Sequence, residues 1–424
     1  MKAKTTRILI TGAHGQLGQA LLANLPWLPE FSPSRLRMEI PEASLVSGSA
    51  VKPHSAIAPG SAIEIVALGH QQLDLTSADL PERLSEINAD VIINCAAYNA
   101  VDAAEQDIAA AMALNAEAPE RLAIWCRQQG AWLIHISSDY VFGNVFGNVF
   151  GNDLGSVFGN VSGNVSANML GNAPRALTES DVCEPLSLYG QSKLAGEQRL
   201  LKANPGALVL RTSWLYSRFG SNFVLTMRRL LTERPELKVV ADQVGTPTWS
   251  EALARLIWQL LIWFHLNPEK SAVLSGCFHY AATGQCSWYL FTQEIAEQIA
   301  KQQCNSAPSS QAAVPLQTAS PSQTALQSQA TLHAQAALAN PAPITPGCRI
   351  TPVSTVEYGA LLNRAQAPRP AYSALDSSAL KYAMAAMPSA FRCYLPKDYQ
   401  SPIWLSWQAQ LALMLSGLGA SSLD

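Results

Sequence analysis

Short apolar runs alternate with amphipathic stretches along the first half of the chain. The apolar runs have the length and aliphatic content of strands that are buried on both faces. They lie at residues 7–11, 63–68, 90–95, 132–137 and 208–212, and helical periodicity marks residues 16–25, 80–87 and 107–129. This alternation predicts an α/β fold, a Rossmann-type doubly wound parallel sheet with right-handed crossovers.

Three stretches break the alternation. Residues 26–60 are rich in Pro, Ser and Ala, and residues 306–346 are rich in Gln, Ala, Ser and Pro with almost no charge. Residues 143–172 belong to a tandem array in which Val-Phe-Gly-Asn begins at positions 141, 145, 149 and 157. That period fits neither a helix nor a known solenoid. We interpret all three stretches as surface insertions, with a lid as the alternative for the array.

The composition fits a globular protein, with 48% hydrophobic and 14% charged residues. A net charge of −3 provides no basic field for nucleic acid and no polybasic patch for a membrane. The apolar run at residues 8–10 is too short for a signal peptide, and the run at 253–266 is too short to span a bilayer, so we expect a buried helix there. The cysteines form no CxxC pair, which favours reduced thiols in the cytoplasm over a zinc site or a redox dithiol.

A glycine-rich turn joins the first predicted strand to the first predicted helix. Gly12, Gly15 and Gly18 have the spacing G-x-x-G-x-x-G. The first glycine permits the sharp turn, the second lets the backbone approach a pyrophosphate, and the third lets the helix pack closely on the strand. The helix N-terminus adds free N–H groups and the positive end of its dipole. The turn therefore predicts a dinucleotide site, with an ordinary glycine-rich βα turn as the plainer alternative.

The end of the second predicted strand bears on the choice of cofactor. An acid at this place binds the ribose 2′-hydroxyl and selects NAD, whereas here Leu68 is followed by Gly-His-Gln. The missing acid favours NADPH, or the use of both cofactors. Asp74 follows in Leu-Asp-Leu-Thr. It either contacts the adenine side of the cofactor or belongs to the cap region of the next helix, and we favour the first.

Tyr189 and Lys193 share one face of a predicted helix, since residues i and i+4 lie above one another. An ammonium beside a phenol lowers the pKa of the tyrosine, which can then donate a proton to a carbonyl oxygen as hydride reaches the carbon. Ser138 follows the fourth strand at the ligand-binding edge of such sheets and can hydrogen-bond the same oxygen. A lone Tyr-x-x-x-Lys is common by chance, but with Ser138 and the glycine turn it predicts a dehydrogenase.

Together these elements resemble the extended short-chain dehydrogenases, and longer runs resemble the dTDP-4-dehydrorhamnose reductase family. The runs lie at residues 94–105, 137–142, 185–197, 211–216, 243–248 and 369–376. The resemblance implies reduction of dTDP-4-dehydro-6-deoxy-L-mannose (dTDP-4-dehydro-β-L-rhamnose) to dTDP-L-rhamnose by NADPH or NADH, a step of dTDP-rhamnose biosynthesis. It implies an NAD(P)-binding Rossmann domain over residues 1–210 and a smaller, mainly substrate-binding domain over residues 211–424.

The resemblance also assigns roles to single residues. Tyr189 matches the proton donor and Lys193 its partner, both also in contact with the cofactor, and Ser138 stands where the family usually has threonine. Ser138, Asp139 and Trp214 match substrate-binding positions, and a core tryptophan is the alternative for Trp214. The other cofactor contacts implied are Gly12, Gly15, Gln16, Leu17, Gly18, Asp74, Leu75, Ala96, Ala97 and Tyr98.

The chain also departs from the family pattern. Some relatives are metal-bridged dimers that use an acid just after the glycine turn, where this chain has Ala20. We therefore expect no metal ligands, which argues against magnesium and leaves a homodimer open. The array lies between Ser138 and Tyr189 and must loop outward for the two side chains to meet.

Two other functions stay open. Some family members are non-catalytic NADP-binding regulatory subunits of a methionine adenosyltransferase, although Trp214 within Arg-Thr-Ser-Trp favours the enzyme. A reductase or epimerase of another nucleotide sugar is the remaining alternative.

Overall fold

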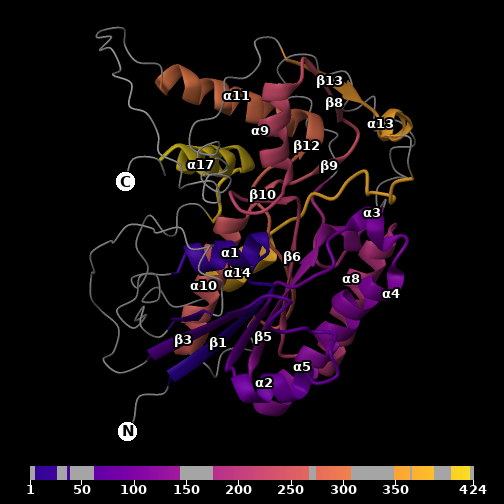
Figure 1. Ribbon diagram of the computed structural model, residues 1–424. Helices are drawn as coiled ribbons and strands as arrows, with labels where there is room; N and C mark the ends of the chain where they lie inside the picture. Colours follow the sequence, from indigo (N-terminus) through magenta and orange to yellow (C-terminus); the bar gives the residue numbers. More distant parts are fainter. Residues whose placement is uncertain are drawn as a thin grey trace, which may run out of the picture.

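A seven-stranded parallel sheet forms the centre of the molecule. The structure, a computed structural model, describes residues 5–25, 36–38, 62–143, 175–266, 274–306, 348–362, 365–385 and 403–420. The strand order is β11-β6-β5-β4-β1-β3-β2, and all neighbouring strands are parallel. Figure 1 shows helices on both faces of this sheet. The predicted doubly wound, Rossmann-type fold is confirmed.

The strands of this sheet end along one edge. Their bounds are β1 Thr5–Thr11, β2 Leu36–Met38, β3 Ala62–Leu68, β4 Val91–Asn94, β5 Trp132–Ser138, β6 Leu208–Thr212 and β11 Gly276–His279. The register aligns Thr11 with both Leu68 and Asn94, and Ser138 with Thr212. The carboxyl ends of five strands therefore meet at the edge where parallel sheets bind ligands.

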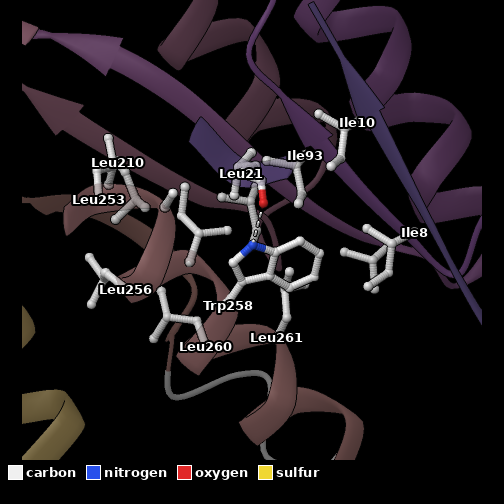
Figure 2. Close-up of a cluster of buried hydrophobic side chains, with 14 of the residues drawn as sticks. Ile8, Ile10, Leu21, Ile93, Leu210, Leu253, Leu256, Trp258, Leu260 and Leu261 are labelled. Atoms are coloured by element: carbon white, nitrogen blue, oxygen red, sulfur yellow. Dashed lines mark hydrogen bonds between the residues drawn. The ribbon is translucent and has the colours of Figure 1, made fainter. Parts of the chain in front are cut away.

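Two apolar layers cover the sheet because alternate strand residues point to opposite faces. Ile8 and Ile10 face α1 (Gln16–Ala23) and α10 (Ser250–Leu266), whereas Leu9 faces α2 (Leu80–Ile87), α5 (Ala118–Gln129) and α8 (Leu188–Ala203). In Figure 2 the indole of Trp258 lies among apolar side chains from α10, α1 and the strands. Its Nε1 donates to the carbonyl of Leu21 at 3.0 Å, so the first helix is fastened to a helix far along the chain.

The structure confirms most predicted elements and corrects two. The predicted helix at residues 107–129 is divided into α4 (Ile108–Met112), a π-helical turn η3 (Ala113–Glu117) and α5. The predicted insertion at residues 26–60 contains β2, which pairs with β3 as the edge strand of the sheet. The interpretation of that stretch as insertion alone is therefore wrong. Residues 144–172 of the array and residues 307–346 lie outside the described residues.

The C-terminal half forms a second group of elements, which Figure 1 shows above the sheet. Its helices are α9 Phe223–Glu233, α11 Trp288–Ser306, α13 Thr355–Leu362 and α17 Trp407–Ala420, whereas α14 Ser378–Ala385 lies against β11 with Leu380 in the core of the central sheet. Its strands are β7 Leu215–Tyr216, β8 Glu236–Val240, β9 Val244–Gly245, β10 Thr248–Trp249, β12 Cys286–Ser287 and β13 Arg349–Val353, which form the pairs β7–β10, β8–β13 and β9–β12. These elements enclose their own apolar cluster, which includes Val224, Phe291 and Leu411.

Within the described ranges no helix combines the length and apolar character needed to cross a bilayer. The run at residues 253–266 lies in α10, whose residues from Leu253 to Trp263 are mostly buried against the sheet. The predicted buried helix is confirmed.

Candidate active site

The glycine turn is shaped by close backbone contacts. Gly12 has φ +64°, and a Cβ there would lie 2.6 Å from the nitrogen of Ala96. A Cβ on Gly18 would lie 2.5 Å from the carbonyl oxygen of Gly12. Both distances are far inside van der Waals contact, so the convergence of β1, β4 and α1 requires glycine at these two positions.

The N-terminus of α1 fits an anion such as a pyrophosphate. Gly15 is the N-cap, no side chain in the described ranges caps the helix, and its first turn carries no acid. The first amide groups are therefore available to a phosphate, with the positive end of the helix dipole behind them. Gln16 adds a buried side-chain oxygen that has no hydrogen-bond partner among the described residues, while Leu17 is buried beneath the turn.

Asn94 joins the ends of three strands. Its Oδ1 accepts from Thr11 Oγ1 at 2.7 Å and from the Ala96 nitrogen at 3.2 Å, and its Nδ2 lies 3.0 Å from Nδ1 of His135. Burial lowers the pKa of His135 well below its ordinary value, so this imidazole is neutral. The network holds the segment Ala96–Ala97 beside the glycine turn. Sequence reasoning missed Asn94 and His135, although Asn94 lies near the end of one predicted strand and His135 within the next.

Asn115 holds the next residue of that segment. Its Oδ1 accepts from the Tyr98 nitrogen at 2.8 Å, and its Nδ2 donates to the Tyr98 carbonyl at 3.1 Å and to Ser192 Oγ at 3.0 Å. Asn115 lies in the π-helical turn and is fully buried. It therefore fixes the backbone of Tyr98 and links it to α8. Its place in an otherwise helical pattern concealed it from the sequence analysis.

Asp74 and Leu75 lie at the far end of the expected cofactor site. The Asp74 carboxylate accepts from the Thr76 nitrogen at 2.9 Å and from Thr76 Oγ1 at 2.7 Å, and these hydrogen bonds lower its pKa. Its side chain is 42% exposed, so the ionised oxygens can also reach a ligand. The N-cap of α2 is Asp79, so Asp74 does not cap that helix. Leu75 is buried.

Tyr189 and Lys193 lie on α8, whose N-cap Ser187 accepts from the Gly190 nitrogen. The phenol of Tyr189 donates to Oδ1 of Asn99 at 3.5 Å. The ammonium of Lys193 donates to the carbonyl of Ile136 in β5 at 2.7 Å. Both side chains are almost completely buried. The two predicted residues thus face the end of the strand that carries Ser138.

The electrostatics of this pair differ from the expectation. Burial raises the pKa of Tyr189 above its ordinary value, and hydrogen bonding with Ser138 is the influence that lowers it. Burial also lowers the pKa of Lys193 to about 8, against the favourable charge of Glu197. The expected lowering of the tyrosine pKa by the lysine is therefore not seen, and desolvation, which penalises the charged forms, dominates the pKa of both groups.

Ser138 and Asp139 lie at the junction of β5 and the short 3-10 turn η4 (Asp139–Val141). Ser138 is half-buried, and its Oγ accepts from the Tyr140 nitrogen at 3.2 Å. Asp139 is 2% exposed, and its carboxylate accepts hydrogen bonds from serines of three segments, Ser138, Ser213 and Ser373.

Trp214 directly follows Ser213 and has an unusual backbone. Its φ of +47° lies in the left-handed region, which costs a non-glycine residue on the order of 1–3 kcal/mol. Its indole stacks on Trp288 with ring centroids 3.4 Å apart and an interplanar angle of 5°. A Cβ on Gly245 would lie 2.5 Å from the same indole. These contacts fix a half-buried indole, and the residue before it, Ser213, bonds the carboxylate of Asp139.

The position expected to carry an acid in metal-bridged relatives is occupied by Ala20, which is fully buried between α1 and α10. Across the part of the chain that the structure describes, no three His, Cys, Asp or Glu side chains come together as metal ligands.

Comparison with known proteins agrees with this geometry. The family model described as the RmlD substrate binding domain matches residues 54–343. A dTDP-4-dehydrorhamnose reductase of Mycobacterium tuberculosis (strain H37Rv) is 32% identical, over 74% of this chain and 83% of that protein. The chain belongs to the dTDP-4-dehydrorhamnose reductase family.

Two further proteins are similar to this chain. A Streptomyces antibioticus protein named a probable dTDP-4,6-dihydroxy-2-methyloxan-3-one 4-ketoreductase is 35% identical, over 72% of this chain and 82% of its own length. The crystal structure of the dTDP-4-dehydrorhamnose reductase from Bacillus anthracis in complex with NADP is 26% identical, with a TM-score of 0.62 over 98% of this chain and 100% of that chain.

Proposed function

We propose that this protein reduces the 4-keto group of dTDP-4-dehydro-β-L-rhamnose to give dTDP-L-rhamnose. The observation that carries the proposal is the placement of Tyr189, Lys193 and Ser138 at one sheet edge, next to a glycine turn that fits a pyrophosphate. Membership of the reductase family supports the same reaction. Free thiols at the described cysteines agree with a location in the cytoplasm.

The cofactor would lie across the carboxyl edge of the sheet. The residues that would hold it are Gly12, Gly15, Gln16, Leu17 and Gly18 at the pyrophosphate, Asp74 and Leu75 at the adenine side, and Ala96, Ala97, Tyr98, Tyr189 and Lys193 toward the nicotinamide. Bound NADPH or NADH supplies the hydride. Because β3 ends at Leu68 and is followed by Gly69 rather than an acid, the site favours NADPH or both cofactors.

The side chains of this chain manage the proton and the geometry. Tyr189 donates its phenolic proton to the oxygen formed from the ketone, and its burial keeps that proton in place until the oxygen becomes basic. Lys193 uses one of its three donors on the Ile136 carbonyl, which leaves two for the ribose and the phenol. Ser138 helps to position the ketone oxygen, and Trp214 lines the sugar pocket.

A different dTDP-linked 4-keto sugar is the second candidate substrate, because the Streptomyces relative named as a 4-ketoreductase is as similar as the rhamnose enzymes. The test is NADPH and NADH oxidation by the purified protein with a panel of dTDP-, GDP- and UDP-linked 4-keto sugars. We expect the highest kcat/KM with dTDP-4-dehydro-β-L-rhamnose. Cofactor binding without reduction of any of these sugars would overturn the proposal.

Replacing the phenol that supplies the proton gives the first mutational prediction. Tyr189→Phe should keep NADPH affinity and lower kcat about 10²-fold or more, since general acid catalysis contributes about 10²–10⁴-fold. Tyr140→Phe is the matched control because its ring packs edge-on against Tyr189 at 5.4 Å. A Tyr189→Phe variant with nearly normal kcat would remove this phenol from the mechanism.

A further inference from the structure

Asp139 is a buried carboxylate whose two oxygens are already occupied by hydroxyl donors. Oδ1 accepts from Ser138 Oγ at 3.0 Å, and Oδ2 accepts from Ser213 Oγ at 3.0 Å and from Ser373 Oγ at 2.6 Å. The side chain is 2% exposed. Because the carboxylate is almost completely buried and already accepts from three hydroxyl groups, direct binding of the sugar is a poor account of this residue.

The three serines come from segments that are far apart in sequence. Ser138 ends β5, Ser213 lies between β6 and Trp214, and Ser373 lies in the C-terminal segment that pairs with β9 through a bond from its nitrogen to the Val244 carbonyl at 2.8 Å. One carboxylate therefore joins the reaction centre to the indole of the expected sugar pocket and to the C-terminal half.

The same carboxylate fixes the oxygen of Ser138. This oxygen accepts from the Tyr140 nitrogen at 3.2 Å and donates to Asp139, and its proton can rotate from there toward a ketone oxygen. A hydroxyl has two acceptor lone pairs, so one of them stays free after the Tyr140 bond. Ser138 also acts on the phenol of Tyr189, because hydrogen bonding with Ser138 lowers the pKa of Tyr189.

We propose that Asp139 is a positioning residue whose carboxylate holds the Ser138 oxygen at the reaction centre and couples it to the Trp214 loop and the C-terminal segment. The inference rests on the proposed function. It reassigns Asp139 from the substrate contact expected from the sequence to a residue that acts through Ser138.

The three hydroxyl donors favour an ionised carboxylate, because a protonated oxygen would bring a proton of its own to the same contacts. Burial raises the pKa of Asp139 to about 6, and the three serine hydrogen bonds act against that rise. The other titratable groups around it are the phenols of Tyr140 and Tyr189, with the ion pair of Arg369 and Asp102 beyond Tyr140. As pH falls through about 6, protonation removes an acceptor, and kcat should fall with it.

Removing one of the serine donors should shift the pH dependence of kcat. A purely structural role of Asp139 does not predict such a shift. Ser373→Ala takes away a hydrogen bond that favours the ionised form, so the acidic limb of the kcat–pH profile should shift to higher pH. Ser377→Ala is the matched control, because among the described residues this buried hydroxyl in the same segment bonds the backbone of Ala281 and not Asp139. Ser213→Ala should shift the limb in the same direction as Ser373→Ala.

A double-mutant cycle tests whether Asp139 acts through Ser138. Asp139→Asn should lower kcat about tenfold to a hundredfold by misplacing Ser138 and should abolish the acidic limb, with unchanged NADPH affinity. In the Ser138→Ala background the same substitution should cost almost nothing in kcat. Equal losses of kcat in both backgrounds, or an unshifted acidic limb in Ser373→Ala, would overturn the role of Asp139 and leave the proposed function standing. Wild-type protein that reduces no nucleotide-linked keto sugar would instead overturn the proposed function.

Discussion

Gly12 shows how a single backbone position determines the site. Its left-handed conformation would cost any other residue about 1–2 kcal/mol. In addition, a Cβ there would overlap the backbone of Cys95 and Ala96, so any substitution would force this segment away from β1. The glycine turn was predictable from the sequence because its spacing is a direct consequence of these local contacts.

Gly12→Ala should therefore lower Tm strongly and weaken NADPH binding at least tenfold, since both the strain and the overlap act on the turn. Gly130→Ala is the matched control. Gly130 also has a left-handed φ, +69°, but nothing lies within 4 Å of its Cβ position. It should lose only about 1 kcal/mol of stability and keep its affinity for NADPH. Similar effects of the two substitutions on NADPH affinity would contradict the close packing of the turn. Fluorescence titration and thermal unfolding measure both.

Lys193 illustrates a residue kept for chemistry at the expense of stability. Because burial lowers its pKa to about 8 from an ordinary value of 10.5, the unfolded chain binds more protons between these pH values, and stability rises with pH across that window. Lys193→Met should raise the unfolding free energy by about 1–2 kcal/mol near pH 7, after loss of the Ile136 hydrogen bond, and should abolish turnover. Chemical denaturation at pH 7 and pH 10 should show this advantage shrinking as pH rises. A variant less stable than wild type at pH 7 would contradict the buried charge penalty.

At the scale of elements, the π-helical turn η3 between α4 and α5 gives Asn115 contacts with two neighbouring segments. The turn brings the Asn115 side chain to the backbone of Tyr98, and the backbone carbonyl of Asn115 packs so closely on α8 that a Cβ at Gly196 would lie 2.0 Å from it. π-helical turns often mark functional sites for such reasons. Asn115→Ala should leave the Tyr98 nitrogen and carbonyl without partners and cost about 1–3 kcal/mol. A raised KM for NADPH together with a lower Tm would confirm that Asn115 holds Tyr98 in place for the cofactor. A lower Tm with an unchanged KM would show that Asn115 contributes to stability alone.

The elements that the sequence predicted correctly are those whose pattern is local. The bounds of α2 and β6 match the prediction because an amphipathic period and a buried apolar run are visible within each segment. The π-helical turn was not predictable, since it keeps the apolar spacing of a helix on either side. The edge strand β2 was hidden because a three-residue strand leaves no periodic signal in a Pro- and Ser-rich stretch. The hydrogen bonds of Asn94, His135 and Asp139 depend on contacts between distant segments and have no local signature at all.

At the scale of the molecule, the boundary expected at residue 210 crosses a shared core. α10 and β11 come after residue 210, yet β11 pairs with β6 and α10 covers one face of the sheet. Fully buried residues of α10, such as Ile257 and Trp258, contact the same cluster as Ile8 and Ile93. The C-terminal half therefore completes the Rossmann layer in addition to forming its own cluster, and the carboxylate of Asp139 adds a polar link between the two halves.

This shared core predicts that residues 1–210 do not fold alone. Without α10 the apolar side chains on one face of the sheet would be exposed, and burying such side chains is worth about 1.5–3 kcal/mol each. A fragment of residues 1–210 should bind the dye ANS and unfold without a cooperative transition, whereas a fragment of residues 1–285, which regains α10 and β11, should recover part of that cooperativity. Calorimetry of the full chain should show one main transition, because each half supplies part of the other's buried surface. A 1–210 fragment that unfolds cooperatively and binds NADPH would show that the first half is an autonomous domain and that α10 is only an added layer.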